Sequence, residues 1–281
     1  MEKASLRLFS VMSGNKACRL VMDTGESKDL DLGSGARREV YLASHGALPY
    51  EEALDLQRRV VAKKIGAPFP DTLLLLEHPP VITLGRRGRM ENIRVSEELL
   101  RREKIDIVHV ERGGDVTYHG PGQIVGYPIF DLAHYRKDLG SFVSSIEEVL
   151  IRVCRDMGIR AGRRSVNRGV WVGEKKIASI GLAVRRWISF HGFALNWAPD
   201  MDHFRFITPC GLTGVEMTSM VEVLGTTPDP GRLREAICRH FEEIFRIRFQ
   251  AVNLAQKLTE GEGHERSQRS EIQQGARMGQ G

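Results

Sequence analysis

The sequence lacks the cysteine patterns that build metal sites and disulfide frameworks. Its four cysteines, Cys18, Cys154, Cys210 and Cys238, are scattered along 281 residues, with no CxxC pair and no Cys/His cluster at zinc-ligand spacing. A chain of this length, with 41% hydrophobic residues, can bury a core without disulfide cross-links. We therefore expect no metal site and reduced thiols, as in a cytoplasmic protein.

Features of several other protein classes are also missing. No run of about 18 apolar residues could span a membrane, and no secretory signal peptide is recognisable at the start. No Gly-Lys-Ser/Thr sequence marks a P-loop, and the basic residues form no aromatic-interleaved stripe of the kind that binds nucleic acids. The formal charge of +5 suits an acidic partner but is also ordinary for an enzyme. We expect a protein that binds neither membranes nor nucleic acids. The basic first stretch leaves an organelle transit peptide open, although acidic residues interrupt it.

Hydrophobic periodicity divides the chain into a central domain and two loose ends. Residues 1–39 show no sustained helix or strand period, so we expect a loose N-terminal extension. Residues 253–281 are mostly polar or glycine, a composition that cannot repay the entropy of ordering, so we expect a disordered C-terminal tail. The folded, catalytic domain is expected to cover residues 40–252.

Apolar spacing within this domain predicts alternating helices and strands. Helical spacing indicates a helix from Tyr50, a short helix after Ser96, a long helix over 141–157 and a last helix over 232–246. Apolar runs predict strands over 72–76, 81–84, 105–110, 169–172, 177–184 and 188–197, the last alternating around His191. No internal repeat is present, so we expect a mixed α/β or α+β domain.

The densest glycine-rich segment carries several polar side chains. It comprises Arg112, Gly113, Gly114, Asp115, Val116, Thr117, Tyr118 and His119, and it continues through Gly120-Pro121-Gly122-Gln123. Glycines at this density allow the backbone to approach a ligand closely. A glycine-bearing hairpin between two strands explains the composition equally well.

Two lysines, Lys175 and Lys176, run directly into the apolar strand that begins at Ile177. A lysine at such a boundary is usually a surface group whose stem covers apolar neighbours. When it is partly desolvated, its ammonium can stabilise an anion or transfer a proton.

Cys210 lies between Pro209 and Gly211, in a predicted turn. Turn placement suits an exposed nucleophile, whereas Cys154 and Cys238 fit helix patterns and are expected to be inert. A free thiol is only a few per cent ionised at neutral pH, so it needs an electropositive neighbour. Lys176, His119 and His191 are candidates that the sequence alone does not separate.

Four motifs in consistent order resemble one enzyme family. RGGDVTYHGPGQ, KKIASIGLAVRRW, SFHGFALNW and TPCGLTG are similar to motifs of the octanoyltransferases of lipoate biosynthesis, also called the lipoate-protein ligase B family. The likeness extends from about Val40 to Phe249. It implies a mixed α/β fold, a sheet flanked by helices similar to the catalytic domains of biotin and lipoate ligases.

The resemblance also implies a reaction and its partners. The octanoyl group would pass from octanoyl-acyl carrier protein to a lysine of lipoyl domains, in the E2 subunits of 2-oxoacid dehydrogenases and in the glycine cleavage H protein. This would be the first step of endogenous protein lipoylation, without a cofactor or metal. Because acyl carrier proteins are acidic, we expect positive charge near the pocket mouth, with Arg185 and Arg186 as candidates.

The resemblance assigns roles to individual residues. Cys210 matches the cysteine that carries the acyl thioester, and Lys176 matches the lysine that activates it. Substrate contacts match the segment from Arg112 to His119 and two further triplets, namely Ser179, Ile180 and Gly181, and Gly192, Phe193 and Ala194.

Two rival functions share this fold or pocket. An ATP-dependent lipoate or biotin ligase would need an adenylate site, for which Gly85-Arg86-Arg87-Gly88-Arg89 is a short and weak candidate that fits a basic turn better. A non-catalytic carrier-binding module would not need both Cys210 and Lys176. An assay with acyl carrier protein, with and without ATP, separates the three.

Overall fold

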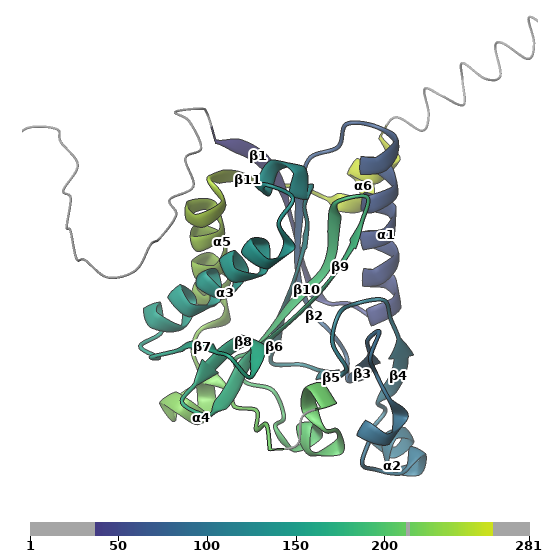
Figure 1. The fold of residues 1–281 in the computed structure, drawn as a ribbon, viewed down its shortest axis with the longest axis vertical. Coiled ribbons are helices and arrows are strands. Elements are labelled where there is room, and N and C mark those ends of the chain that lie inside the picture. Colours follow the sequence, from purple (N-terminus) through teal and green to yellow (C-terminus); the bar gives the residue numbers. More distant parts are fainter. Residues whose placement is uncertain (1–36, 212–213, 261–281) are drawn as a thin grey trace, which may run out of the picture. The chain divides into compact units, whose positions relative to one another are not determined.

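The computed structural model describes residues 37–211 and 214–260, and its centre is an eight-stranded sheet (Figure 1). The strand order is β11, β1, β2, β6, β10, β9, β8, β7. The strands are β1 (Arg38–Ala47), β2 (Thr72–Glu77), β6 (Gln123–Ile129), β7 (Gly162–Arg164), β8 (Asn167–Val172), β9 (Lys175–Arg185), β10 (Ile188–Asn196) and β11 (Ile247–Ala251). β1 pairs in parallel with β2 and β11, and the other neighbours are antiparallel.

A second, three-stranded sheet carries the glycine-rich segment. Its order is β4 (Asp106–His109), β3 (Val81–Leu84), β5 (Val116–His119). β3 is parallel to β4 and antiparallel to β5, so the chain between β4 and β5 returns beside the turn that follows β3. The short helices α2 (Glu97–Arg102) and η1 (Met90–Asn92) connect β3 to β4, and the Ser96 side chain caps α2 as its sequence predicts.

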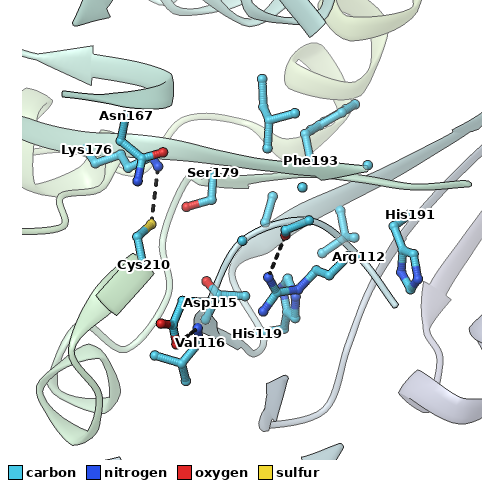
Figure 2. A pocket seen from close by; sticks show the side chains of 18 of the residues that line it. Arg112, Asp115, Val116, His119, Asn167, Lys176, Ser179, His191, Phe193 and Cys210 are labelled. Carbon is cyan, nitrogen blue, oxygen red and sulfur yellow. Dashed lines mark hydrogen bonds between the residues drawn. The ribbon is translucent and has the colours of Figure 1, made fainter. Parts of the chain in front are cut away.

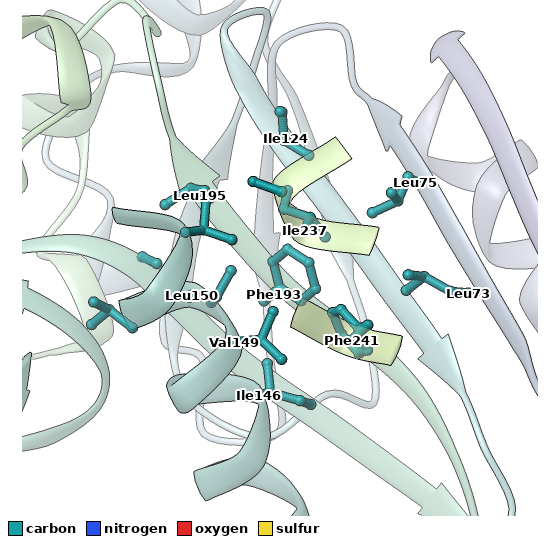
Figure 3. Close-up of a cluster of buried hydrophobic side chains, with 14 of the residues drawn as sticks. Leu73, Leu75, Ile124, Ile146, Val149, Leu150, Phe193, Leu195, Ile237 and Phe241 are labelled. Atoms are coloured by element: carbon teal, nitrogen blue, oxygen red, sulfur yellow. The ribbon is translucent and has the colours of Figure 1, made fainter. Parts of the chain in front are cut away.

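One face of the large sheet is covered by α3 (Leu139–Asp156) and α5 (Pro230–Phe245) (Figure 1). Figure 3 shows apolar side chains of both helices meeting those of β2, β6 and β10. Phe241 of α5 stacks on Phe245 with ring centroids 5.2 Å apart, and on Phe193 of β10 at 6.0 Å. Asp138 and Asp229 accept backbone hydrogen bonds at the helix starts and so fix where each helix begins.

The other face is covered in part by α1 (Tyr50–Gly66), against which α6 (Leu254–Thr259) packs. Leu254 and Leu258 of α6 are buried, and Lys63 of α1 donates hydrogen bonds to the carbonyl oxygens of Lys257 and Leu258. The expectation of a disordered tail from residue 253 is therefore wrong for 254–260, because two leucines in a polar stretch suffice to dock one turn and a half of helix. Residues 261–281 lie outside the described residues.

Most predicted elements are confirmed to within a few residues. The strand over 81–84 is reproduced at both ends, and the long helix begins at Leu139 instead of 141. The domain begins slightly earlier than residue 40, since β1 starts at Arg38 and pairs with β11, a strand the sequence did not predict. The expected extension over 1–36 lies outside the described residues.

The alternation expected around His191 is wrong. Every residue of β10 is buried, because the strand lies in the interior of the sheet with chain packed on both of its faces. Among the described residues, no helix is long and apolar enough to cross a membrane, and no group of three or more His, Cys, Asp or Glu side chains is placed to hold a metal.

Three further short helices complete the path. The 3₁₀ helix η2 (Leu132–Tyr135) precedes α3, η3 (Asp202–Phe206) follows β10, and α4 (Met220–Leu224) precedes α5. The chain between η3 and α4 contains the 3₁₀ turn η4 (Pro209–Gly211), which carries Cys210.

Candidate functional site

Cys210 occupies a strained turn that presents its partly exposed thiol. Its backbone has φ 61° and ψ 11°, the left-handed region that non-glycine residues seldom adopt. Gly211 follows with φ 67°, and a Cβ there would lie 2.4 Å from the Asp115 carboxylate, so only glycine fits. Backbone bonds from Gly211 to Thr208, and from Thr208 to Asn92, hold the turn. The thiol is thus placed by a turn that is bonded to itself and to Asn92.

Lys176 meets this thiol from the second position of β9. Its side chain is 1% exposed, and its Nζ lies 3.4 Å from the Cys210 Sγ (Figure 2). The stem passes over Gly169, where a Cβ would lie 2.5 Å from the lysine Cε, and the ammonium lies 5.5 Å from the centre of the Trp171 ring. The surface-group interpretation of Lys176 is therefore wrong, and it fits Lys175, which is exposed and pairs with Glu216.

Backbone pairing explains why the lysine and the cysteine meet. The amide of Lys176 donates to the Glu216 carbonyl at 2.8 Å, and the amide of Thr218 donates to the Lys176 carbonyl at 2.9 Å. The segment after the cysteine turn is therefore attached to the first residues of β9, although the two are far apart in the sequence.

A narrow pocket extends from this pair along β9 and β10. Figure 2 shows Lys176 and Cys210 at one end and His191 at the other. All the residues that the resemblance assigned to substrate contact line it, with one exception. Tyr118 does not, because it alternates with Thr117 and His119 on β5; its ring is buried against Phe204 and its hydroxyl bonds His203 Nδ1 at 2.8 Å.

The glycine-rich segment lies directly across β9. The amide of Gly113 donates to the Leu182 carbonyl at 2.8 Å. A Cβ on Gly181 would come within 2.8 Å of the Gly113 carbonyl oxygen, so this close approach needs glycine. Arg112 is buried and donates to the Thr83 hydroxyl and carbonyl and to the Gly113 carbonyl, which anchors the segment to β3. The hairpin alternative for this segment is wrong, because β4 and β5 each pair with β3 and not with each other, and β6 belongs to the other sheet. The segment forms a wall of the pocket.

Three histidines surround the far end of the pocket as neutral groups. Burial lowers the pKa of His78 to about 4 and that of His191 to about 4, and burial holds the pKa of His119 well below its usual range. His191 Nδ1 lies 3.4 Å from the Tyr50 hydroxyl, and His78 Nε2 lies 2.7 Å from the Tyr127 hydroxyl. Of the three cations considered for Cys210, Lys176 alone is in contact with the sulfur and His119 and His191 are neutral at pH 7.

Several lining residues could not be identified from the sequence. They are Tyr50, Arg87, Val125, Tyr127 and Asn167. Tyr50 and Tyr127 belong to an ordinary amphipathic helix and a buried strand, so their patterns indicate packing only. Arg87 lies in the Gly85–Arg89 segment, whose glycine and arginine content was the one available signal.

The remaining described cysteines are poor nucleophiles. Burial raises the pKa of Cys154 to about 12, and burial followed by the nearby Glu242 carboxylate raises the pKa of Cys238 to about 11. Their predicted placement on helices is confirmed. Cys18 lies outside the described residues.

Comparison with known proteins identifies the class. The model of the lipoyl protein ligase A/B catalytic domain matches residues 49–242. The fold is similar to that of the bipartite lipoate protein ligase of Thermoplasma acidophilum, with a TM-score of 0.61 at 19% identity over 80% of this chain and 93% of that one. It is also similar to lipoate-protein ligase A bound with ATP, with a TM-score of 0.59 at 17% identity over 81% and 95% of the two chains. The expected fold class is confirmed, and the chain has the lipoyl protein ligase fold.

Closer relatives narrow this class. The octanoyltransferase of Syntrophobacter fumaroxidans is 46% identical over 217 residues, which cover 77% of this chain and 95% of that protein. The octanoyltransferase of Solibacter usitatus is 46% identical over 208 residues, or 74% and 94% of the two chains. The chain belongs to the octanoyltransferase family, as the four motifs predicted, and is an acyltransferase.

Proposed function

We propose that this protein transfers an octanoyl group from octanoyl-acyl carrier protein to a lysine of lipoyl domains, through a thioester on Cys210. The 3.4 Å contact between the Lys176 Nζ and the Cys210 Sγ is the observation that supports this most strongly. The names of the relatives support the acyl group, and the contact with the sulfur makes Lys176 the group that handles the proton. We place the reaction in the cytoplasm, where thiols are reduced.

In the first half-reaction, the Cys210 sulfur attacks the carbonyl carbon of the octanoyl thioester. The bond from that carbon to the carrier sulfur breaks, and the carrier leaves as a thiol. A neighbouring ammonium favours the attacking thiolate, and Lys176 can give the departing sulfur the proton that Cys210 has lost. One thioester replaces another, so little free energy is required.

In the second half-reaction, the acceptor lysine amine attacks the Cys210 thioester. A carbon-nitrogen bond forms, the carbon-sulfur bond breaks, and Cys210 returns as a thiol after the amine proton has passed through Lys176. Because an amide is more stable than a thioester, this step runs downhill without ATP. The acceptors are the lipoyl domains of 2-oxoacid dehydrogenase E2 subunits and the glycine cleavage H protein.

The other residues of the pocket wall bind the acyl chain or hold the site in position. The narrow space along β9 and β10 receives the acyl chain, bounded by Ile180, Phe193, Ala194 and the glycine-rich segment. Arg112 and Asp115 hold that segment and the cysteine turn in place. At the far end of the pocket His119 and His191 are neutral, and the Arg112 guanidinium is bound to Thr83 and to the Gly113 carbonyl, which leaves room for an apolar chain.

Intact-mass measurement of a lipoyl domain tests the proposal. We expect the domain to gain one octanoyl mass when it is mixed with this protein and octanoyl-carrier protein in ATP-depleted buffer. Cys210→Ala should abolish the gain, whereas Cys238→Ala, at another described cysteine, should retain it. Modification that requires ATP and free octanoate would instead assign the chain to the ligases.

A further inference from the structure

A wide groove adjoins the narrow pocket at Cys210. Its volume is about 840 Å³, against about 70 Å³ for the pocket. Cys210 lines both spaces, and so does Arg87. A thioester that reaches the sulfur with its acyl chain in the pocket can therefore extend the rest of its donor into the groove.

The groove has an excess of positive charge. Five arginines line it, against the two carboxylates Asp115 and Glu147: Arg87, Arg89, Arg163, Arg164 and Arg168. The expected candidates Arg185 and Arg186 are instead at the turn between β9 and β10 and line neither space. Positive charge does gather at the mouth, but on a different part of the chain.

The arginines of the groove differ in how their charge is already used. Arg163 and Arg168 both contact the buried Glu147 at 3.2 Å, and Arg164 contacts Glu174 at 3.3 Å. For the side chains of Arg87 and Arg89, the described part of the chain supplies no ion-pair or hydrogen-bond partner. These two guanidinium groups are therefore free to bind an anion.

The backbone that carries them is fixed. The amides of Gly85, Arg86 and Arg87 donate to the carbonyl oxygens of Asp115, Arg112 and Gly114 at 3.0 to 3.1 Å. The amide of Gly88 closes the turn onto Gly85 at 2.7 Å, and the amide of Arg89 points to the Asp115 carboxylate at 3.4 Å. Because the turn is held by the pocket wall, the backbone that carries both arginines loses little further entropy on binding.

We propose that Arg87 and Arg89 bind the phosphate of the donor's phosphopantetheine arm. The inference rests on the proposed function, because it takes the donor to be an acyl thioester carried on that arm. A guanidinium pairs with phosphate through two parallel hydrogen bonds, and the singly charged phosphodiester of the arm is the charged group nearest to the reacting thioester on a carrier-bound donor. The turn thereby recognises the donor beside Cys210. It binds the phosphopantetheine arm and not the surface of the carrier protein.

Three donors that differ by one part each provide the test. They are octanoyl-pantetheine, octanoyl-phosphopantetheine and octanoyl-carrier protein. For each donor, the second-order rate constant for acylation of Cys210 is measured in the absence of an acceptor. The readout is the intact mass of the full-length protein. The ratio of the second donor to the first isolates the phosphate, because the two molecules differ in nothing else.

The wild type should prefer octanoyl-phosphopantetheine by about tenfold or more, since hydrogen bonds to charged groups have effects of this size. The double variant Arg87→Ala/Arg89→Ala should bring that ratio close to one. The double variant Arg86→Ala/Arg101→Ala removes the same charge from exposed residues that line neither space, and it should keep the wild-type ratio.

Two results overturn the assignment. Equal use of the two small donors by the wild type would show that no phosphate site exists, and a defect of the variant confined to octanoyl-carrier protein would assign the arginines to the carrier's acidic surface. Failure of the wild type to acylate Cys210 from any of the three donors is a different result, because it contradicts the proposed function itself.

Discussion

Over residues 192–195, the two faces of strand β10 carry side chains of different size. Phe193 and Leu195 pack in the apolar core with α3 and α5, and Phe193 also lines the pocket beside Gly192 and Ala194. Side chains alternate between the two faces over 192–195, and a φ of 55° at His191 interrupts the alternation before them. Small residues on one face leave the space that a ligand needs.

The two faces also differ in charge. The helix-covered face packs aromatic rings such as Phe130, Phe142 and Phe245 against one another. The pocket face buries Arg112 and Lys176, which is costly unless the groups have partners or a use. The face that packs against α3 and α5 therefore supplies most of the stability. On the pocket face, the burial of charged groups lowers the stability and provides groups for the proposed reaction. Variants that separate stability from activity test this division.

The largest effect on stability is expected on the helix-covered face. Phe241→Ala removes a fully buried ring and should lower the free energy of unfolding by about 3–5 kcal/mol. Acyl transfer per folded molecule should stay within about twofold of wild type. Urea unfolding and assays at low temperature measure the two quantities, with the exposed Val223→Ala as control. If Phe241→Ala kept the wild-type free energy of unfolding but no longer transferred octanoyl, the proposed separation of stability and activity between the two faces would be wrong.

The opposite pattern is expected at Lys176. Lys176→Met keeps the length of the side chain and removes its charge, so single-turnover acylation of Cys210 should slow by about 10²–10³-fold. Stability should not fall, because the ammonium no longer has to be buried. Lys175→Met changes the exposed neighbour and should retain the wild-type rate. Unaltered acylation by Lys176→Met would show that another group handles the proton.

Acid should lower the free energy of unfolding through the buried His78, which packs behind the pocket. The pKa of His78 is about 4 in the folded protein and near 6.5 in the unfolded chain, so between these values the unfolded chain binds more protons. Stability should therefore fall as the pH drops from about 6.5 to 4, by at most about 3 kcal/mol for this residue. Denaturant unfolding across that range should show a weaker pH dependence in His78→Asn than in the exposed His109→Asn. Identical slopes in the two variants would remove His78 from the explanation.

The smallest effect is expected where the pocket wall crosses β9. Gly181→Ala places a Cβ about 2.8 Å from the Gly113 carbonyl, so the glycine-rich segment must shift, at a cost of about 1–3 kcal/mol. The Michaelis constant for the donor should rise with it. Gly46→Ala is the matched control, because nothing lies within 4 Å of its added Cβ. Equal effects of the two substitutions would mean that the close approach at Gly181 is unimportant.

How much the sequence could predict depends on how local each signal is. The strand Val81–Leu84 and the helix capped by Ser96 follow from contiguous patterns, and the sequence predicts both. β11 and α6 are short, with five and six residues, and they form because β1 and α1 offer partners that are distant in sequence. The same limit explains why the neutral state of His191 and the burial of Lys176 required the structure: both depend on packing from several segments.

The site shows the same limit. The four motifs mark the cysteine, the lysine and most of the pocket wall, and the structure brings them together. Tyr118 belongs to the same motif but faces away, because a motif does not state which face of a strand a residue occupies. Arg87 and Arg89 belong to a turn whose function depends on its position beside Cys210, which no local pattern indicates.

Peptide-level mass spectrometry tests the central claim most directly. The full-length protein is incubated with octanoyl-carrier protein and no acceptor, digested at neutral pH, and then compared with a sample to which a lipoyl domain was added before digestion. We predict one octanoyl mass on the peptide that contains Cys210, its removal by hydroxylamine as expected for a thioester, and its loss when the lipoyl domain is present. An adduct on Cys18, Cys154 or Cys238 instead, or transfer that survives in Cys210→Ala, would contradict the account.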